Sequence, residues 1–69
     1  MDKFPQILRA RREELGLSQL ELAKRAFVGR SSVSSYELGR SVPALDVAVP
    51  LAKALDLTLD ELAGVEPEK

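Results

Sequence analysis

The clearest structural signals of the chain lie in residues 15–40, which read LGLSQLELAKRAFVGRSSVSSYELGR. Ser18 and Glu21 match a capping box, in which a hydroxyl and a carboxylate satisfy free backbone N–H groups at a helix start. The pattern predicts a helix after Ser18 that ends near residues 27–29. Its expected inner face consists of three apolar side chains: Leu22, Ala23 and Ala26.

A second short helix is expected at residues 30–37, where Val33, Tyr36 and Glu37 recur at helical spacing before Gly39. The four serines of this segment do not favour a helix intrinsically, so packing against the rest of the chain has to hold it. Two short helices joined by a three-residue turn have the outline of a helix-turn-helix motif.

The segment before this motif predicts one more helix. Phe4, Ile7 and Leu8 are spaced as on one helix face. Asp2 is placed to cap this helix, and Gly16 is placed to end it.

The segment after the motif predicts two further helices. Residues 45–55 have helical periodicity, but Pro50 lacks a backbone N–H and clashes with the preceding turn. We therefore expect the fourth helix to be kinked or to start late. Thr58 and Glu61 form a second capping box, and Gly64 ends the last helix. With no strand candidate, the sequence predicts an all-α fold of five short helices.

Length and composition limit the classes of function. A chain of 69 residues is room for one small domain, expected over residues 1–69 with a core at about 4–63 and a frayed tail at 64–69. The chain has no cysteine and no histidine, which excludes disulfides, thiolate or histidine metal sites and histidine-dependent triads. We expect no cofactor, no metal and no catalytic residue. Without a signal peptide or an apolar run of about 18 residues, we expect a cytoplasmic protein that does not enter a membrane.

Charge is distributed unevenly along the chain. The net charge of −1 argues against a nucleic-acid binder when it is taken alone. However, residues 1–40 carry a net charge of +3 and residues 41–69 carry −4. A small dipolar domain of this kind can present a basic face to a polyanion and keep its acidic face away, although small chains often have uneven charge.

The ordered set of spacings over residues 6–63 resembles the phage repressor/Cro family of DNA-binding domains, also called the XRE-type helix-turn-helix family. The positions that carry the resemblance are Leu15-Gly16-Leu17-Ser18-Gln19, Leu22-Ala23, Val28, Val33, Glu37, Gly39-Arg40, Pro43, Ala52-Lys53-Ala54-Leu55 and Leu59-Asp60-Glu61-Leu62. The resemblance implies a compact lambda-repressor-like domain that binds double-stranded DNA as a transcriptional repressor or controller. It also implies a homodimer, whose expected contact is the C-terminal segment with Leu57, Leu59, Leu62 and Val65. The alternative for these four side chains is the core of the chain itself.

The same resemblance implies roles for individual residues. Residues 30–37 become the recognition helix, with base contacts from Arg30, Ser31 and Ser35. Arg30 is the only long donor of the three and suits a bidentate contact with guanine. The implied phosphate contacts are Gln19, Ser32, Ser34 and Arg40. Arg30 could instead contact a phosphate without reading a base, the serines could be ordinary polar surface residues, and Gln19 could be an ordinary residue of the first helical turn.

Arg12 and Glu37 match a pair that meets in the family, so we expect a mostly buried ion pair between the first helix and the end of the recognition helix. The chain departs from the family at the turn, where Phe27 replaces the usual glycine. A left-handed backbone costs a bulky residue roughly 1–2 kcal/mol, so either the turn is reshaped or Phe27 packs. Gly29 replaces the usual cap, and Leu20 occupies a position that is normally polar.

Two other classes of function compete with DNA binding. Leu20 and the acidic C-terminal half could serve a protein-interaction module, such as an antitoxin that holds a partner protein through the same fold. An enzyme is disfavoured, because the paired carboxylates at residues 13–14 and 60–61 are neighbours in sequence and do not face each other on a helix.

Overall fold

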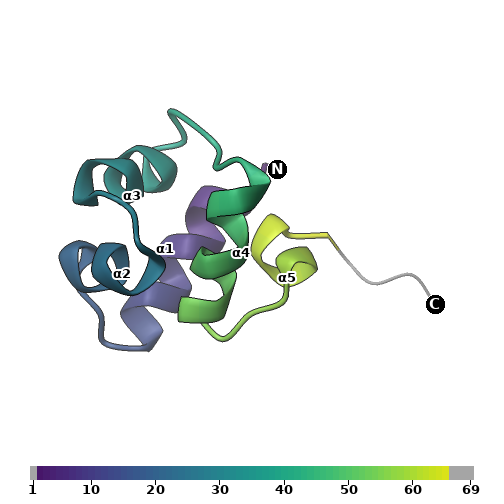
Figure 1. Cartoon of the computed structure of the whole chain (residues 1–69). Coiled ribbons are helices and arrows are strands. Elements are labelled where there is room, and N and C mark those ends of the chain that lie inside the picture. The colour runs from purple at the N-terminus through teal and green to yellow at the C-terminus, as the bar shows by residue number, and fades with distance from the viewer. Residues whose placement is uncertain (1, 66–69) are drawn as a thin grey trace.

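The computed structural model describes residues 2–65, which form five helices and no strand (Figure 1). The helices are α1 (Phe4–Glu14), α2 (Gln19–Ala26), α3 (Arg30–Glu37), α4 (Leu45–Ala54) and α5 (Leu59–Ala63). The predicted all-α, five-helix fold is confirmed, with α2 and α3 joined by a three-residue turn. No helix among the described residues is long and apolar enough to cross a membrane.

Both predicted capping boxes are present. Ser18 Oγ accepts from the Glu21 backbone N–H at 3.0 Å, and a Glu21 carboxylate oxygen accepts from the Ser18 N–H at 2.9 Å. Thr58 and Glu61 make the same pair of contacts at the start of α5. The predicted Asp2 cap is wrong: the helix begins one residue later, so Lys3 occupies the cap position and makes no side-chain hydrogen bond.

All five helices contribute to one apolar core. The largest fully buried side chains are Phe4, Leu8, Leu22, Val33, Leu51 and Leu55. The helix α2 packs against α3 and α4, while α1 packs against α3 and α5. The Phe4 and Tyr36 rings meet edge to face, with centroids 6.0 Å apart. Such contacts supply the tertiary packing that the serine-rich α3 requires.

Pro50 lies inside α4 without ending it. Of the two expectations for Pro50, the late start is wrong, because the helix begins at Leu45 and continues through Pro50 to Ala54, while the kink stays a prediction. Proline at this position removes the hydrogen bond to the carbonyl four residues earlier, on Asp46. Asp46 is exposed, so water can serve its carbonyl, while Leu51 and Ala52 keep the helix on the core.

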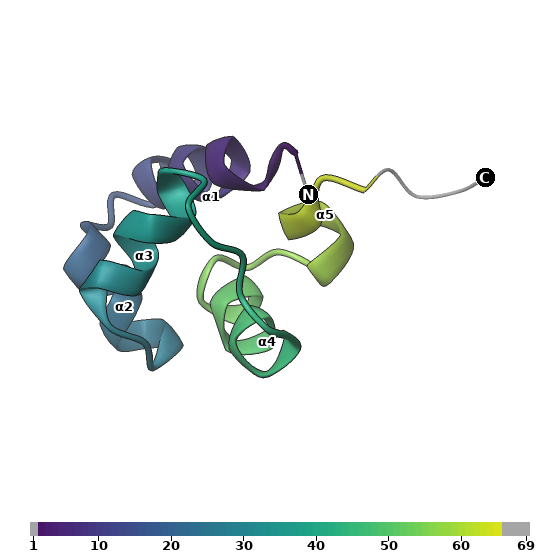
Figure 2. The ribbon, with the colours of Figure 1, turned by 90° about the horizontal axis from the view of Figure 1, so that it is seen from above.

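The end of α5 meets the start of α1 (Figure 2). Gly64 has a left-handed backbone with φ of 77°, and a Cβ added there would lie 3.0 Å from Lys3 Cβ. The Val65 N–H also donates to the Asp60 carbonyl at 2.9 Å. Gly64 and Val65, expected in a frayed tail, therefore belong to the hydrogen-bonded end of α5. The rest of that expected tail, residues 66–69, lies outside the described residues.

Candidate nucleic-acid interface

The helix α3 presents a polar face to solvent and an apolar face to the core. Val33 and Tyr36 are buried. Arg30 and Ser31 are exposed, while Ser32, Ser34 and Ser35 are half-buried. Arg30, Ser31, Ser34 and Ser35 share one side of the helix, because residues three to four apart lie above one another. The structure thus brings these predicted DNA contacts onto one accessible surface.

The turn between α2 and α3 keeps its left-handed residue despite the bulky side chain. Phe27 has φ of 59° and ψ of 41°, and its residue surface is 88% exposed. The turn is therefore not reshaped, and Phe27 does not offset its backbone strain by packing. After this turn, Gly29 takes an extended conformation at the cap position, and α3 begins at Arg30.

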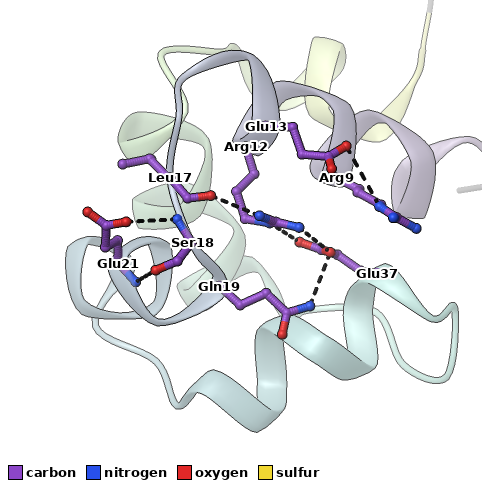
Figure 3. Close-up of polar contacts among 8 residues, drawn as sticks. All are labelled: Arg9, Arg12, Glu13, Leu17, Ser18, Gln19, Glu21 and Glu37. Atoms are coloured by element: carbon purple, nitrogen blue, oxygen red, sulfur yellow. Dashed lines mark hydrogen bonds and ion pairs between the residues drawn. The ribbon is translucent and has the colours of Figure 1, made fainter.

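Arg12 and Glu37 form the predicted ion pair between α1 and α3 (Figure 3). Arg12 Nε donates to one carboxylate oxygen of Glu37 at 2.6 Å, and Nη2 donates to the other at 3.0 Å. Arg12 Nη1 donates to the Leu17 carbonyl at 2.8 Å, just before α2 begins. The two side chains are 13% and 5% exposed, so the pair is mostly buried, as expected.

Gln19 joins this ion pair, which the sequence did not predict. Its side-chain Nε2 donates to the Glu37 oxygen Oε1 at 3.2 Å (Figure 3). The contact links the first residue of α2 to the last residue of α3. We call Arg12, Glu37 and Gln19 the polar network. No spacing signal could have found the Gln19 contact, since the two residues are 18 positions apart and lie on different helices.

The polar network keeps Glu37 ionised. Burial alone raises the pKa of the Glu37 carboxyl, but hydrogen bonds from Arg12 and Gln19 and the Arg12 charge outweigh it and hold that pKa below its ordinary value. The hydrogen bond to Glu37 likewise raises the pKa of Arg12. The network is therefore a fixed charge pair at neutral pH.

Among the other arginines, some contact their own chain and others are exposed. Arg11 Nε donates to the Leu55 carbonyl at 2.8 Å, and Arg9 pairs with Glu13 at 3.7 Å, so both contact their own chain. Arg40 is exposed after the C-terminal end of α3, where its backbone N–H donates to the Ser35 carbonyl at 2.9 Å. Arg30 and Arg40 thus lie near opposite ends of α3, which is about 12 Å long.

The C-terminal segment contains an open apolar pocket of about 340 Å³. Its walls are Phe4, Pro43, Leu45, Ala48, Leu59, Asp60, Leu62 and Ala63. Leu62, expected in a dimer contact, is only 2% exposed and belongs to the core, and Leu57 packs partly against that core. Leu59 and Val65 are exposed as a contact between chains requires, and Leu45 is 70% exposed at the pocket's edge.

Comparisons with known proteins agree with this geometry. The chain matches the helix-turn-helix family over residues 8–62. It is 45% identical over 49 residues to an uncharacterized HTH-type transcriptional regulator of Methanothermobacter thermautotrophicus, covering 71% of each chain. It is 29% identical over 62 residues to the cryptic phage CTXphi transcriptional repressor RstR of Vibrio cholerae, covering 90% of this chain and 55% of that repressor.

Two solved structures have the same fold. One is the restriction-modification controller protein C.AhdI from Aeromonas hydrophila, with a TM-score of 0.82, 42% identity and coverage of 87% of this chain and 91% of that one. The other is the DNA-binding domain of the P22 c2 repressor, with a TM-score of 0.83, 30% identity and coverage of 87% and 79%. Both similarities extend well beyond the two helices of the motif.

Proposed function

The chain belongs to the helix-turn-helix family of DNA-binding transcription regulators, and from that premise we propose how it binds DNA. The helix α3 enters the major groove as the recognition helix. The observation that carries this proposal is the division of α3 into a buried apolar face and an accessible face with Arg30 and three serines. Its attachment to α1 and α2 by the polar network presents that face as a rigid unit.

Base contacts come from Arg30, Ser31 and Ser35. Arg30 has no ion-pair partner among residues 2–65, so its guanidinium can donate two hydrogen bonds to guanine O6 and N7. Serine has a short side chain that can hydrogen-bond to several different bases. Specific hydrogen bonds to base edges are therefore concentrated at one base pair per recognition helix, and water and DNA shape contribute the rest of the specificity.

Phosphate contacts flank these base contacts. Gln19 is the first residue of α2, where the free N–H groups and the helix dipole favour an anion. Arg40 supplies a charge near the far end of α3, and Ser32 and Ser34 supply hydroxyl donors. The described part of the acidic half, residues 41–65, is expected to face away from the duplex, since its negative charge would repel the phosphates.

A homodimer through the α4–α5 end completes the proposal. The apolar pocket, with Leu45 and Leu59 at its surface, offers an area that a second copy can cover. Val65 extends this apolar area along the chain. A two-fold pair of recognition helices would read half-sites about 34–36 Å apart, one turn of the duplex.

The test is the affinity for a selected duplex and for random duplexes across a salt series. If Arg30 binds guanine, Arg30→Ala should reduce the difference in binding free energy between the selected duplex and random duplexes by about 1–3 kcal/mol. Arg40→Ala is the matched control: it should weaken binding to all duplexes about equally and reduce the salt slope by about one. An equal loss on all sequences for Arg30→Ala would make Arg30 a phosphate contact.

The dimer is tested separately by sedimentation. Leu45→Asp places a charge at the pocket edge and should shift the protein toward a monomer, while Val42→Asp, also at an exposed apolar residue but outside the pocket, should not. If the folded protein binds no duplex at low salt, the function is better explained by a protein-interaction module. The proposal requires no catalysis and no cofactor. As part of the proposal, the protein acts in the cytoplasm as a single DNA-binding domain over residues 1–69.

A further inference from the structure

We propose that Glu37 is a positioning residue for DNA binding. It orients the Gln19 carboxamide toward a phosphate, while Arg12 neutralises the negative charge of Glu37. This inference rests on the proposed phosphate contact of Gln19. It assigns to the ion pair between α1 and α3 a second task besides holding the helices together.

The geometry fixes the direction of the Gln19 amide. An ionised carboxylate only accepts hydrogen bonds, whereas a carboxamide has an accepting oxygen and a donating nitrogen. Glu37 Oε1 accepts from Gln19 Nε2 at 3.2 Å, so the opposite orientation would set two accepting oxygens against each other. The second N–H of Nε2 therefore remains available for another acceptor, on a side chain that Glu37 already orients. A phosphate oxygen only accepts hydrogen bonds, so this N–H is the group that can bind it.

The arrangement of Arg12 solves an electrostatic difficulty. A lone carboxylate beside a DNA phosphate would repel it. Arg12 donates to both oxygens of Glu37, at 2.6 and 3.0 Å, and so places a positive charge directly behind the carboxylate. Arg12 also donates to the Leu17 carbonyl, which holds the guanidinium next to the start of α2. Glu37 can therefore accept the Gln19 hydrogen bond without an uncompensated negative charge next to the proposed phosphate contact.

Holding α1 to α3 requires only Arg12 and Glu37. The third contact connects the pair to the first residue of α2, which is half-buried rather than enclosed in the core (Figure 3). Gln19 consequently begins α2 with a side chain held by α3. The ordering of this side chain takes place on folding, so binding DNA requires less loss of side-chain entropy.

The test compares two substitutions that each remove one negative charge. Simple charge repulsion predicts that Glu37→Gln strengthens DNA binding. Positioning predicts the opposite, a loss of about three- to tenfold on every duplex, because a carboxamide in place of the Glu37 carboxylate both donates and accepts and no longer selects one orientation of Gln19. Glu21→Gln is the control: glutamine also fits the capping box, and Glu21 does not contact the network. Its DNA affinity should stay the same or rise.

A double-mutant cycle separates positioning from other effects. Gln19→Ala should weaken binding by about tenfold, and Glu37→Gln should add little in the Gln19→Ala background. The proposal would be overturned if the double variant lost affinity by the product of the two single losses. A gain of affinity in Glu37→Gln would also overturn it. If Gln19→Ala binds as well as wild type while Arg40→Ala binds less well, the DNA function stands and the positioning role fails. If the wild type binds no duplex, the proposed function fails first.

A second measurement covers the case in which Glu37→Gln is too unstable. All affinities are measured well below each variant's melting temperature. In the wild-type protein, NMR of the Gln19 side-chain amide should show one ordered orientation without DNA and a shift of its signals when a duplex is added. Averaged signals in the free protein, or no shift on adding DNA, would overturn the inference.

Discussion

The α2–α3 side and the α4–α5 side of the domain are held by different kinds of contact. On the first side, α1, α2 and α3 meet at the polar network, where three side chains share directional hydrogen bonds. On the second side, buried apolar residues such as Leu51, Leu55 and Leu62 pack together, and Arg11 adds one hydrogen bond to the Leu55 carbonyl. Among residues 2–65, no ion pair involves α4 or α5.

This difference corresponds to what each side presents to a partner. Directional contacts fix the angle and register of α3, as reading base edges in a groove requires. Apolar packing fixes position less strictly, and it leaves a pocket that a second apolar surface can fill. The stability of the two sides should therefore respond differently to the truncation of a side chain, to acid and to the removal of backbone strain.

The largest effect should follow a truncation on the apolar side. Leu51 is fully buried on α4, so Leu51→Ala should cost about 2–5 kcal/mol of unfolding free energy. A domain of this size rarely has more than about 3–5 kcal/mol to lose. Urea unfolding should show a largely unfolded variant at room temperature. Leu20→Ala, at an exposed leucine of α2, should unfold almost like the wild type; equal losses would contradict the described core.

On the polar side, Arg12→Ala should cost nearly as much. It leaves the mostly buried Glu37 carboxylate without its main partner, a change that costs about 3–5 kcal/mol in fully buried pairs and less here, where some exposure remains. Arg9→Ala removes an exposed pair and should change stability by less than about 0.5 kcal/mol. If thermal melts show similar small losses for both, the polar network is not what holds α1 to α3.

Acid should weaken the polar side selectively. The pKa of Glu37 is lowered in the folded protein, so its contribution is complete above its unfolded value near 4.5 and is lost as pH falls through the lower folded value. The pKa values of the capping residues Glu21 and Glu61 are lowered as well and act in the same direction. Urea unfolding between about pH 7 and 2.5 should show this loss. Glu37→Gln should flatten the curve, and a curve as steep as the wild type's would exclude Glu37 as a cause.

Relief of the left-handed turn should stabilise the α2–α3 side. Phe27→Gly removes a strain of roughly 1–2 kcal/mol and an exposed ring, so it should raise the melting temperature. Asp56 has φ of 56° in the turn between α4 and α5, and aspartate tolerates this conformation better. Asp56→Gly should therefore gain less. A lower melting temperature for Phe27→Gly would mean that the ring makes a stabilising contact.

The smallest effect should come from Pro50→Ala, which restores a backbone donor to the Asp46 carbonyl. We expect a rise in melting temperature of a few degrees, on the order of 1 kcal/mol or less, because proline also restricts the unfolded chain. Calorimetry of the variant measures this balance. No gain would show that the helix already accommodates the proline at no net cost.

The contrast between the two sides also explains what the sequence could predict. Local signals were sufficient for the starts of α2 and α5, since Ser18 with Glu21 and Thr58 with Glu61 form capping boxes there. The Arg12–Glu37 contact was predicted from the family resemblance.

The late start at Pro50 was wrong, because burial of Leu51 outweighs the local penalty of a proline inside the helix. Leu62 belongs to the core, which was the alternative to the expected dimer contact, because periodicity does not distinguish a core from an interface. Gln19 met Glu37 only through the tertiary arrangement of α2 and α3.

The contact between Lys3 and Gly64 has a consequence for chain topology. These residues are near opposite ends of the sequence, yet their backbones are close enough that a Cβ on Gly64 would press on Lys3. A short linker could join them, and the loop at residues 41–44 between α3 and α4 could carry new termini. A circularly permuted chain of this kind would keep α2, α3 and their polar network in one uninterrupted segment. The DNA-reading unit would then be preserved while the order of the remaining helices changes around it.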